Sequence, residues 1–219
     1  MQTHNISEQN SILNTFIAEI RSVTQQKDRM RFRRNIERIG EILGYEMSKV
    51  LKYAPSEVET PLGFCQMEQP QNEIVLCSIL RAGVPLHHGL LNYFDHAENA
   101  FISAYRQHQK QPESFEILVE YLACPNLEGK TLILADPMLA TGQSLVATFE
   151  ALMPFGKPKE VHLVCAIGAQ QGIDFIAKYF DSSTHLWIAS VDQELNDKGY
   201  IIPGLGDAGD LAYGEKLQQ

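Results

Sequence analysis

Residues that could bind a phosphorylated sugar are concentrated at positions 131–144, which read Thr-Leu-Ile-Leu-Ala-Asp-Pro-Met-Leu-Ala-Thr-Gly-Gln-Ser. A short apolar run typical of a buried parallel strand comes first, and the carboxylate of Asp136 follows it. The loop after Asp136 includes the hydroxyls of Thr141 and Ser144 and leads into a segment with the pattern of a helix. Main-chain N–H groups at the start of a helix bind anions, and a neighbouring carboxylate can accept hydrogen bonds from sugar hydroxyls. The stretch therefore predicts a site for a ribose 5-phosphate, which carries a phosphate beside a diol.

Two arginines come at the ends of other predicted strands. Arg81 follows the apolar strand 74–80, and Arg106 ends the short strand 101–106. A guanidinium beside a buried strand needs an anionic partner, and its planar fork fits phosphate oxygens. Because open α/β sheets bind ligands at the carboxyl ends of their strands, we expect both arginines to form an anion clamp beside Asp136. For Arg81, an ion pair with a carboxylate at the rim of the sheet is the alternative.

A glycine-rich segment near the end of the chain is the second informative stretch. Residues 199–210 read Gly-Tyr-Ile-Ile-Pro-Gly-Leu-Gly-Asp-Ala-Gly-Asp. Glycines let the backbone approach another group closely, so that main-chain N–H and C=O groups can pair with the amide edge of a planar base. A wrong base would leave such groups unpaired, which makes a segment of this kind selective. A glycine-rich surface loop is the alternative interpretation.

Together these stretches resemble the uracil phosphoribosyltransferases, which are type I phosphoribosyltransferases. The resemblance rests on Ile-Leu-Arg-Ala-Gly at 79–83, Asp-Pro-Met-Leu-Ala-Thr-Gly at 136–142 and the tail at 199–210. It extends in register from Arg31 to Gly214, with the weakest similarity between 107 and 128. It implies transfer of phosphoribose from 5-phosphoribosyl 1-diphosphate (PRPP) to uracil, giving UMP and pyrophosphate in pyrimidine salvage.

The resemblance also implies a role for each matching residue. Catalysis would involve Arg81, Arg106 and Asp207. PRPP would be bound by Arg81, Arg106, Asp207 and the loop Asp136, Pro137, Met138, Leu139, Ala140, Thr141, Gly142, Gln143 and Ser144. Uracil would be held by Ile201, Gly206, Asp207 and Ala208, mostly through main-chain groups. Mg²⁺ would be the cofactor, chelated by PRPP without a direct protein ligand and contacted by Asp207 through water.

Two features depart from the family pattern. Gln143 stands where the phosphate loop normally has glycine, and it would weaken binding if that position required a positive φ angle or a close approach to phosphate. Residues 107–128 also lack the usual family sequence. Their polar part, from Gln107 to Ser114, is predicted to be a mobile arm that covers the site and excludes water.

Predicted strands and helices alternate along the chain. Apolar spacing predicts helices over 11–23, 28–52, 87–94, 145–153 and 171–179, and strands over 74–80, 101–106, 115–122, 131–135, 161–168 and 185–190. This alternation predicts an α/β domain with a mostly parallel sheet flanked by helices, as in the type I phosphoribosyltransferase fold. We expect a single domain over 1–219, in which the N-terminal helices 11–52 and the C-terminal tail 191–219 pack as a small hood. Residues 53–72 are predicted to be a loop or a peripheral hairpin.

Composition narrows the class of partner. The net charge of −9 argues against nucleic acid, whose phosphates need a basic surface. Four widely spaced cysteines are expected to be free thiols. The first residues lack a secretory signal and no run is long enough to span a bilayer, so we predict a cytoplasmic protein with small-molecule substrates and no membrane partner. By resemblance it would form a homodimer or a larger homo-oligomer, for which the apolar N-terminal helices are a candidate interface.

Other interpretations of the same sequence remain. Five of the eight arginines lie between Arg29 and Arg38, where we expect a solvated helix face paired with Glu37 and Glu41. The alternative function is a non-catalytic regulator that binds PRPP or UMP on the same fold. A phosphoribosyltransferase for another base is a third possibility, against which the tail at 199–210 argues.

Overall fold

The computed structural model describes residues 1–108 and 115–217, and the side chains of all these residues except 104–108 and 115–119. Its central sheet contains β1 (Gln2–Asn5), β4 (Ile74–Leu80), β5 (Glu98–His108), β6 (Phe115–Ala123), β7 (Thr131–Ala135), β8 (Met138–Leu139), β9 (Glu160–Ala169) and β10 (His185–Asp192). Two further pairs are β2 (Tyr53–Thr60) with β3 (Gly63–Pro70), and β11 (Glu194–Leu195) with β12 (Ile201–Ile202). The helices are α1 (Leu13–Arg21), α2 (Arg29–Ser48), α3 (Val84–Leu91), α4 (Gln143–Leu152), α5 (Gln170–Ile176) and α6 (Ala208–Tyr213).

The sheet is mostly parallel. Its strand order is β1-β10-β9-β7-β4-β5-β6, and β8 pairs with β9 beside this path. Only β5 and β6 run antiparallel to each other. The α/β architecture expected from the sequence is therefore confirmed, and the carboxyl ends of β4, β7, β9 and β10 lie along one edge.

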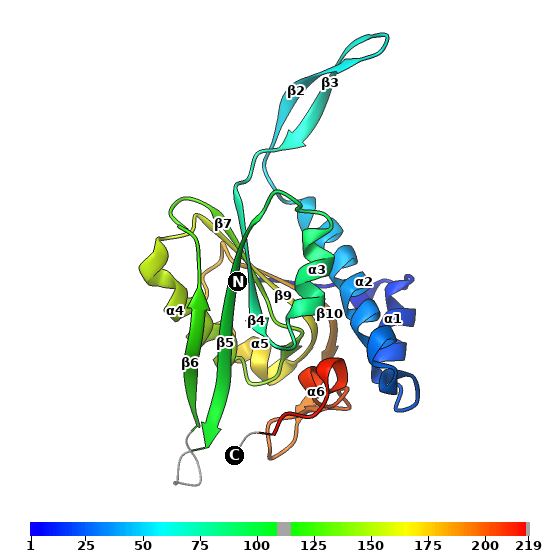
Figure 1. The fold of residues 1–219 in the computed structure, drawn as a ribbon, viewed down its shortest axis with the longest axis vertical. Helices are drawn as coiled ribbons and strands as arrows, with labels where there is room; N and C mark the ends of the chain where they lie inside the picture. The colour runs from blue at the N-terminus through cyan, green and yellow to red at the C-terminus, as the bar shows by residue number, and fades with distance from the viewer. Residues whose placement is uncertain (109–114, 218–219) are drawn as a thin grey trace.

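Helices cover both faces of the sheet (Figure 1). On one face, α1, α2 and α3 form a core with alternate strand residues such as Leu76 and Ile133. On the other face, α4 and α5 pack against their neighbours in sequence, Val75 and Leu132. Strands buried on both sides in this way are typical of parallel sheets, which explains their almost continuous apolar sequences.

The predicted helices are present, with different ends. α1 and α2 are shorter than predicted, and Asp28 caps α2 as expected by accepting a hydrogen bond from the Arg31 amide (3.1 Å). The start expected for α3 at His87 is wrong, because Pro85 fits the first turn and the helix begins at Val84. α4 likewise begins at Gln143 rather than at 145.

The first strand, β1, was not predicted. Its sequence Gln-Thr-His-Asn is polar, yet it pairs in parallel with β10 at the sheet edge. The His4 ring stacks on Trp187, with ring centroids 3.9 Å apart, and His4 Nε2 lies 2.9 Å from His185 Nδ1. Aromatic packing between side chains distant in sequence therefore supports a strand that has no alternating pattern.

Helix α2 contacts the C-terminal helix α6. Arg33 of α2 donates a hydrogen bond to the Ala212 carbonyl (2.6 Å), and its guanidinium lies 5.8 Å from the centre of the Tyr213 ring. α2 also belongs to the helical layer that covers the sheet, so it is not part of a separate hood alone. The predicted single domain over 1–219, with a hood formed by the N-terminal helices and the C-terminal tail, stays a prediction. Residues 53–70 form the β2–β3 hairpin, which projects away from the body (Figure 1).

Candidate active site

The loop after β7 runs alongside β9 and is hydrogen-bonded to it. The Asp136 amide donates to the Val164 carbonyl (3.1 Å), and Asp136 Oδ1 accepts a hydrogen bond from the Met138 amide (3.1 Å). Met138 and Leu139 then form β8, paired in parallel with Ile167 and Gly168 of β9. The carboxylate thus fixes the first turn of the loop, which we call the phosphate loop (136–144).

Close packing against α5 holds the second half of the phosphate loop. Gly142 has a φ of +80°, and a Cβ there would lie 2.5 Å from Ile176 Cγ2. A Cβ on Gly172 would lie 2.1 Å from the Ala140 carbonyl oxygen. α4 starts directly afterwards, and the first amides of a helix have no carbonyl of their own helix to bond. The loop and the start of α4 therefore have the geometry of an anion site.

Gln143 does not occupy a position that requires glycine. Across residues 1–108 and 115–217, every residue with positive φ is a glycine, and the one in this loop is Gly142. Gln143 is the first residue of α4, where its amide remains available to an anion. The first condition under which glutamine would weaken binding, a positive φ angle, is therefore not met.

Arg81 directly follows β4, which pairs in parallel with β7, the strand that leads into the phosphate loop. Gly83, two residues later, packs closely against the ends of β4 and β7, since a Cβ there would lie 2.5 Å from the Ile79 oxygen and 3.0 Å from the Ala135 oxygen. The half-exposed Arg81 guanidinium donates from Nη2 to Asp210 Oδ1 (3.0 Å) and to the Gly214 carbonyl (3.2 Å). The alternative interpretation, a pair with a carboxylate at the rim, is therefore confirmed, whereas the binding of phosphate by Arg81 stays a prediction.

Arg106 occupies the interior of β5. The predicted end of the strand at Arg106 is wrong, because β5 continues to His108 and pairs with β6, with Arg106 opposite Ile117. The Arg106 side chain lies outside those described. Most of the predicted mobile arm, residues 109–114, also lies outside the described residues, while Gln107 and His108 belong to β5.

The glycine-rich tail folds into a short strand, a turn and a helix. β12 ends at Ile202, the Ile202–Pro203 peptide is cis, and Gly204 and Gly206 have φ angles of +58° and +100°. Asp207 then caps α6 by accepting a hydrogen bond from the Asp210 amide (3.0 Å). We call residues 201–210 the base loop. The helix that begins within it was not predicted, because Gly204, Gly206 and Gly209 obscure the apolar spacing typical of a helix.

Asp207 is an ionised carboxylate at neutral pH. Burial raises its pKa, but the Asp210 amide and Lys216, whose Nζ lies 3.1 Å from Asp207 Oδ2, outweigh burial and hold the pKa below its usual range. A Cβ placed on Gly209 would lie 3.2 Å from Asp207 Oδ1 and 3.8 Å from Arg81 Nη2. Arg81 therefore links the β4–β7 edge of the site to the base loop.

Comparison with known proteins shows which family this chain is similar to. The family model described as uracil phosphoribosyltransferase matches residues 7–215. A uracil phosphoribosyltransferase of Porphyromonas gingivalis is 50% identical over 217 residues, which cover 99% of this chain and 100% of that protein. One of Pyrococcus furiosus is 37% identical over 208 residues, covering 93% and 88% of the two chains. The structure of the AQ2163 protein from Aquifex aeolicus superposes with a TM-score of 0.87 at 30% identity, covering 99% of this chain and 100% of that one.

The chain belongs to the uracil phosphoribosyltransferase family. The motifs that carried the resemblance lie within the matched range, and two of them, at 79–83 and 199–210, meet through the Arg81–Asp210 contact.

Residues that sequence reasoning missed hold the base loop of this family member. Arg21 pairs with Asp192 at the end of β10 (2.8 Å), and both bond to Gly204. The arginine cluster of α2 was only partly predicted. Arg34 does pair with Glu37 (2.7 Å), but Arg31 reaches Glu19 on α1.

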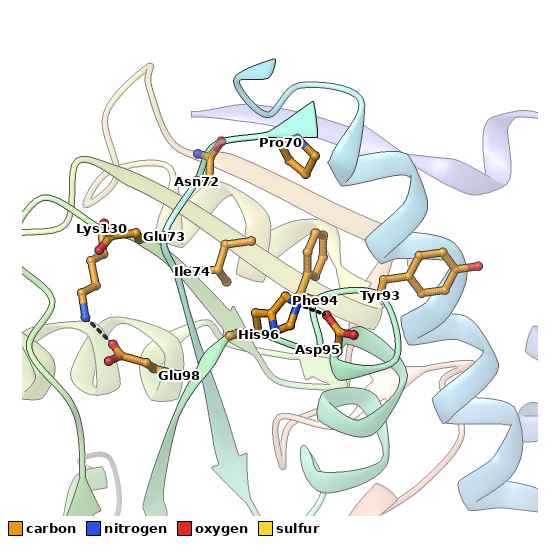
Figure 2. Close-up of a pocket in the computed structure, with 11 residues that line it drawn as sticks. Pro70, Asn72, Glu73, Ile74, Tyr93, Phe94, Asp95, His96, Glu98 and Lys130 are labelled. Atoms are coloured by element: carbon orange, nitrogen blue, oxygen red, sulfur yellow. Dashed lines mark hydrogen bonds and ion pairs between the residues drawn. The ribbon is translucent and has the colours of Figure 1, made fainter. Parts of the chain in front are cut away.

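A pocket of about 430 Å³ lies at the opposite edge of the sheet (Figure 2). It is lined by the residues that precede or begin parallel strands, including Ile74, Glu98 and Lys130, and by the loop after α3, including Tyr93 and Phe94. Lys130 pairs with Glu98. Because parallel sheets of this class bind ligands at the carboxyl edge, the pocket is not part of the candidate active site.

Metal-binding groups, cysteines and apolar helices bear on further predictions from the sequence. No group of three or more His, Cys, Asp or Glu residues in the described part of the chain could hold a metal ion. The four cysteines are free, as predicted, and burial raises the pKa of Cys77 and Cys165. Among the described helices, none has both the length and the apolar character needed to cross a membrane.

Proposed function

We propose that this family member catalyses the reaction of uracil with PRPP to give UMP and pyrophosphate, in the cytoplasm, as a step of pyrimidine salvage. The proposal rests on the Arg81–Asp210 contact. This contact joins the loop at 79–83, which resembles a pyrophosphate-binding loop, to a tail suited to binding a planar base. Family membership adds independent support.

The phosphate loop would bind the 5-phosphate of PRPP. Amides of residues 139–144 and the start of α4 supply N–H donors, and the helix dipole favours negative charge there. Asp136 would accept hydrogen bonds from the ribose hydroxyls. Thr141 and Ser144 add hydroxyl donors near the same phosphate.

Arg81 and Arg106 would stabilise the pyrophosphate that leaves. A guanidinium fork binds two phosphate oxygens at once, which is stronger than a single contact. Arg81 is 44% exposed and bonds to Asp210, so pyrophosphate oxygens would replace that carboxylate without opening a buried core.

The acidic residues fit an Mg²⁺ ion carried by the substrate. Mg²⁺ at phosphate sites usually keeps several waters and uses one or two carboxylates together with phosphate oxygens. Asp207 and Asp210 both lie next to Arg81, and Asp207 would contact the ion through water. When bound, Mg²⁺ would neutralise charge on the pyrophosphate.

The base loop would hold uracil so that its N1 faces the ribose. Main-chain groups of Ile201, Gly206 and Ala208 would pair with the amide edge of the base. The bond from C1 to the pyrophosphate oxygen would break with its electrons on that oxygen, the N1–C1 bond would form, and the N1 proton would pass to water. Asp207, as a carboxylate of low pKa, would stabilise the developing positive charge and accept a hydrogen bond from N1–H.

A homo-oligomer is part of the proposal. The apolar faces of α1 and α2, our first candidate interface, are buried in the core of the same chain. The β2–β3 hairpin is a better candidate, because all eight residues of β3 are exposed and Leu62 at its tip is fully exposed. Isolated two-stranded hairpins are marginally stable in water, so we propose that a second copy covers this one, most simply with twofold symmetry. Replacing residues 57–66 by a short turn should give a monomer in sedimentation equilibrium; an unchanged mass would reject the hairpin as the interface.

The test of function is UMP formation by the purified chain. Uracil, PRPP and Mg²⁺ should give UMP and pyrophosphate in equal amounts, while cytosine and hypoxanthine should give no nucleotide. No turnover with any base, together with saturable binding of UMP or PRPP, would replace the enzyme by a non-catalytic regulator. Turnover with a different base would keep the reaction class and reject the proposed role of the base loop.

A further inference from the structure

Arg21 forms a nearly buried ion pair with the end of β10. Arg21 is the last residue of α1, and its Nη1 and Nη2 donate to Asp192 Oδ2 and Oδ1, each at 2.8 Å. Nη2 also donates to Ser190 Oγ (3.1 Å). The two side chains are only 19% and 8% exposed, so the pair is shielded from solvent and fixed in a bidentate geometry.

The same two side chains hold both sides of one residue in the base loop. Arg21 Nη1 donates to the Gly204 carbonyl (3.0 Å), and Asp192 Oδ2 accepts from the Gly204 amide (3.0 Å). Two adjacent peptide groups of the loop are thereby tied to α1 and β10.

Glycine is the residue type that fits at position 204. Its φ is +58°, and a Cβ there would lie 2.1 Å from the Ile201 carbonyl oxygen. Gly204 stands between Ile201 and Gly206, two of the residues whose main-chain groups are proposed to bind uracil. A movement at Gly204 would therefore move both groups.

We propose that Arg21 and Asp192 are positioning residues for the base: by fixing both peptide groups of Gly204, they set the main-chain hydrogen-bonding groups of 201–208 for uracil. The inference rests on the proposed function of the base loop. Neither side chain touches the phosphate loop in the described contacts, so the effect is confined to the base.

Kinetics of two conservative variants test the inference on the full-length chain. Arg21→Lys keeps the charge but loses the fork, and Asp192→Asn keeps the shape but loses the charge. Small displacements of a substrate-positioning group have large kinetic effects, so the KM for uracil should rise about tenfold or more in each. The KM for PRPP should change by less than about threefold, because the phosphate loop keeps its own supports. Ser190→Ala removes a single bond to Arg21 and should give a smaller change in the same direction.

A matched control exists on the neighbouring helix α2. Arg31 of α2 makes a bidentate pair with Glu19 of α1 (2.7 and 2.8 Å), and none of its described contacts reaches the base loop. Arg31→Lys should leave both KM values within about twofold of wild type. Equal changes in the two KM values for Arg21→Lys and Asp192→Asn, or changes no larger than those of Arg31→Lys, would overturn the inference.

Binding measurements separate this inference from the proposed function. Calorimetry with UMP and with ribose 5-phosphate compares a ligand with a base and a ligand without one. In Arg21→Lys the affinity for UMP should fall about tenfold while the affinity for ribose 5-phosphate stays within about twofold. Equal losses for both ligands would reject the positioning role. A wild-type chain that binds UMP more tightly than ribose 5-phosphate but forms no UMP would reject the proposed catalysis alone.

Discussion

The phosphate loop and the base loop are held in place by different parts of the chain. The phosphate loop is supported by the segments that follow it, because β8 pairs with β9 and Gly172 of α5 packs against Ala140. The base loop is supported by Arg21, which lies 183 positions away from Gly204. One loop depends on a continuous β–α–β segment, and the other on the docking of α1.

This difference implies that the two substrates can be affected separately. Damage to the support of the phosphate loop should weaken PRPP binding, and damage to the support of the base loop should weaken uracil binding. Arg81 contacts the tail and directly follows β4, which pairs with β7, so we take it as the residue at which the two regions meet.

The largest effect is expected where the two regions meet. Arg81→Ala should lower kcat/KM by about 10²- to 10³-fold, because it removes a cation from the developing charge of pyrophosphate. The KM values for uracil and PRPP should both be affected, since Asp210 also loses its partner. Steady-state UMP formation measures the change. A loss smaller than about fivefold would mean that Arg81 serves only its ion pair with Asp210.

Two glycine substitutions should separate the loops. Gly204→Ala places a Cβ in a φ of +58° and 2.1 Å from the Ile201 oxygen, and it should raise the KM for uracil about tenfold or more. Gly142→Ala places a Cβ in a φ of +80° and 2.5 Å from Ile176 Cγ2, and it should raise the KM for PRPP instead. Each variant is the control for the other. The comparison fails if both variants change the same KM.

Lowering the pH should destabilise the whole fold, so its effect should not distinguish the phosphate loop from the base loop. Burial lowers the pKa of His162 to about 4, while the same side chain in the unfolded chain titrates near its ordinary value of 6.5. Between pH 6.5 and 4, the imidazole of His162 binds a proton in the unfolded chain but not in the folded chain. The stability that the neutral, buried His162 contributes is therefore complete above pH 6.5 and is lost as the pH falls through that window. The loss between pH 7 and 5 should reach about 2 kcal/mol for this histidine.

His162→Gln provides the control, because its amide oxygen can still accept the hydrogen bond that Trp187 Nε1 donates to His162 Nδ1 (3.1 Å). Urea unfolding of both proteins at pH 7 and pH 5 gives the difference. An identical pH dependence of the two proteins would show that His162 is not responsible.

The smallest effect is expected at the unusual residue of the phosphate loop. Gln143→Gly should change the KM for PRPP by less than about threefold, since only the amide of this residue faces the anion site in our account. Glycine lowers helix stability. The substitution also removes Gln143 Oε1, a buried atom without a hydrogen-bond partner in the described structure, which offsets part of that loss. The free energy of unfolding should therefore change by no more than about 1 kcal/mol. A tenfold change in the KM for PRPP would assign a direct role to the glutamine side chain.

The parts of the site that the sequence predicted are those formed by neighbouring residues. The strand, Asp136 and the following helix are contiguous, so periodicity and helix-start rules located the phosphate loop. β4 was predicted for the same reason, with Arg81 at its end. α5 was expected, but the close contact of Gly172 with Ala140 became visible only in the fold.

The parts that were missed depend on contacts between distant residues. Arg21 has the ordinary position of a basic residue in the last turn of a helix, and nothing local indicates that Asp192 and Gly204 are its partners. β1 is polar and is held by Trp187, far along the chain. β5 extends past Arg106 because β6 pairs with it, and the polar sequence there gives no such signal.

A structure of the chain with UMP tests the account most directly, because UMP has one group for each loop. The account predicts that its phosphate accepts hydrogen bonds from the amides of 139–144 and that its base pairs with main-chain groups of Ile201, Gly206 and Ala208. The account would be contradicted by a base that lies away from 201–208, or by UMP bound in the pocket between Ile74, Phe94 and Lys130 at the opposite edge of the sheet.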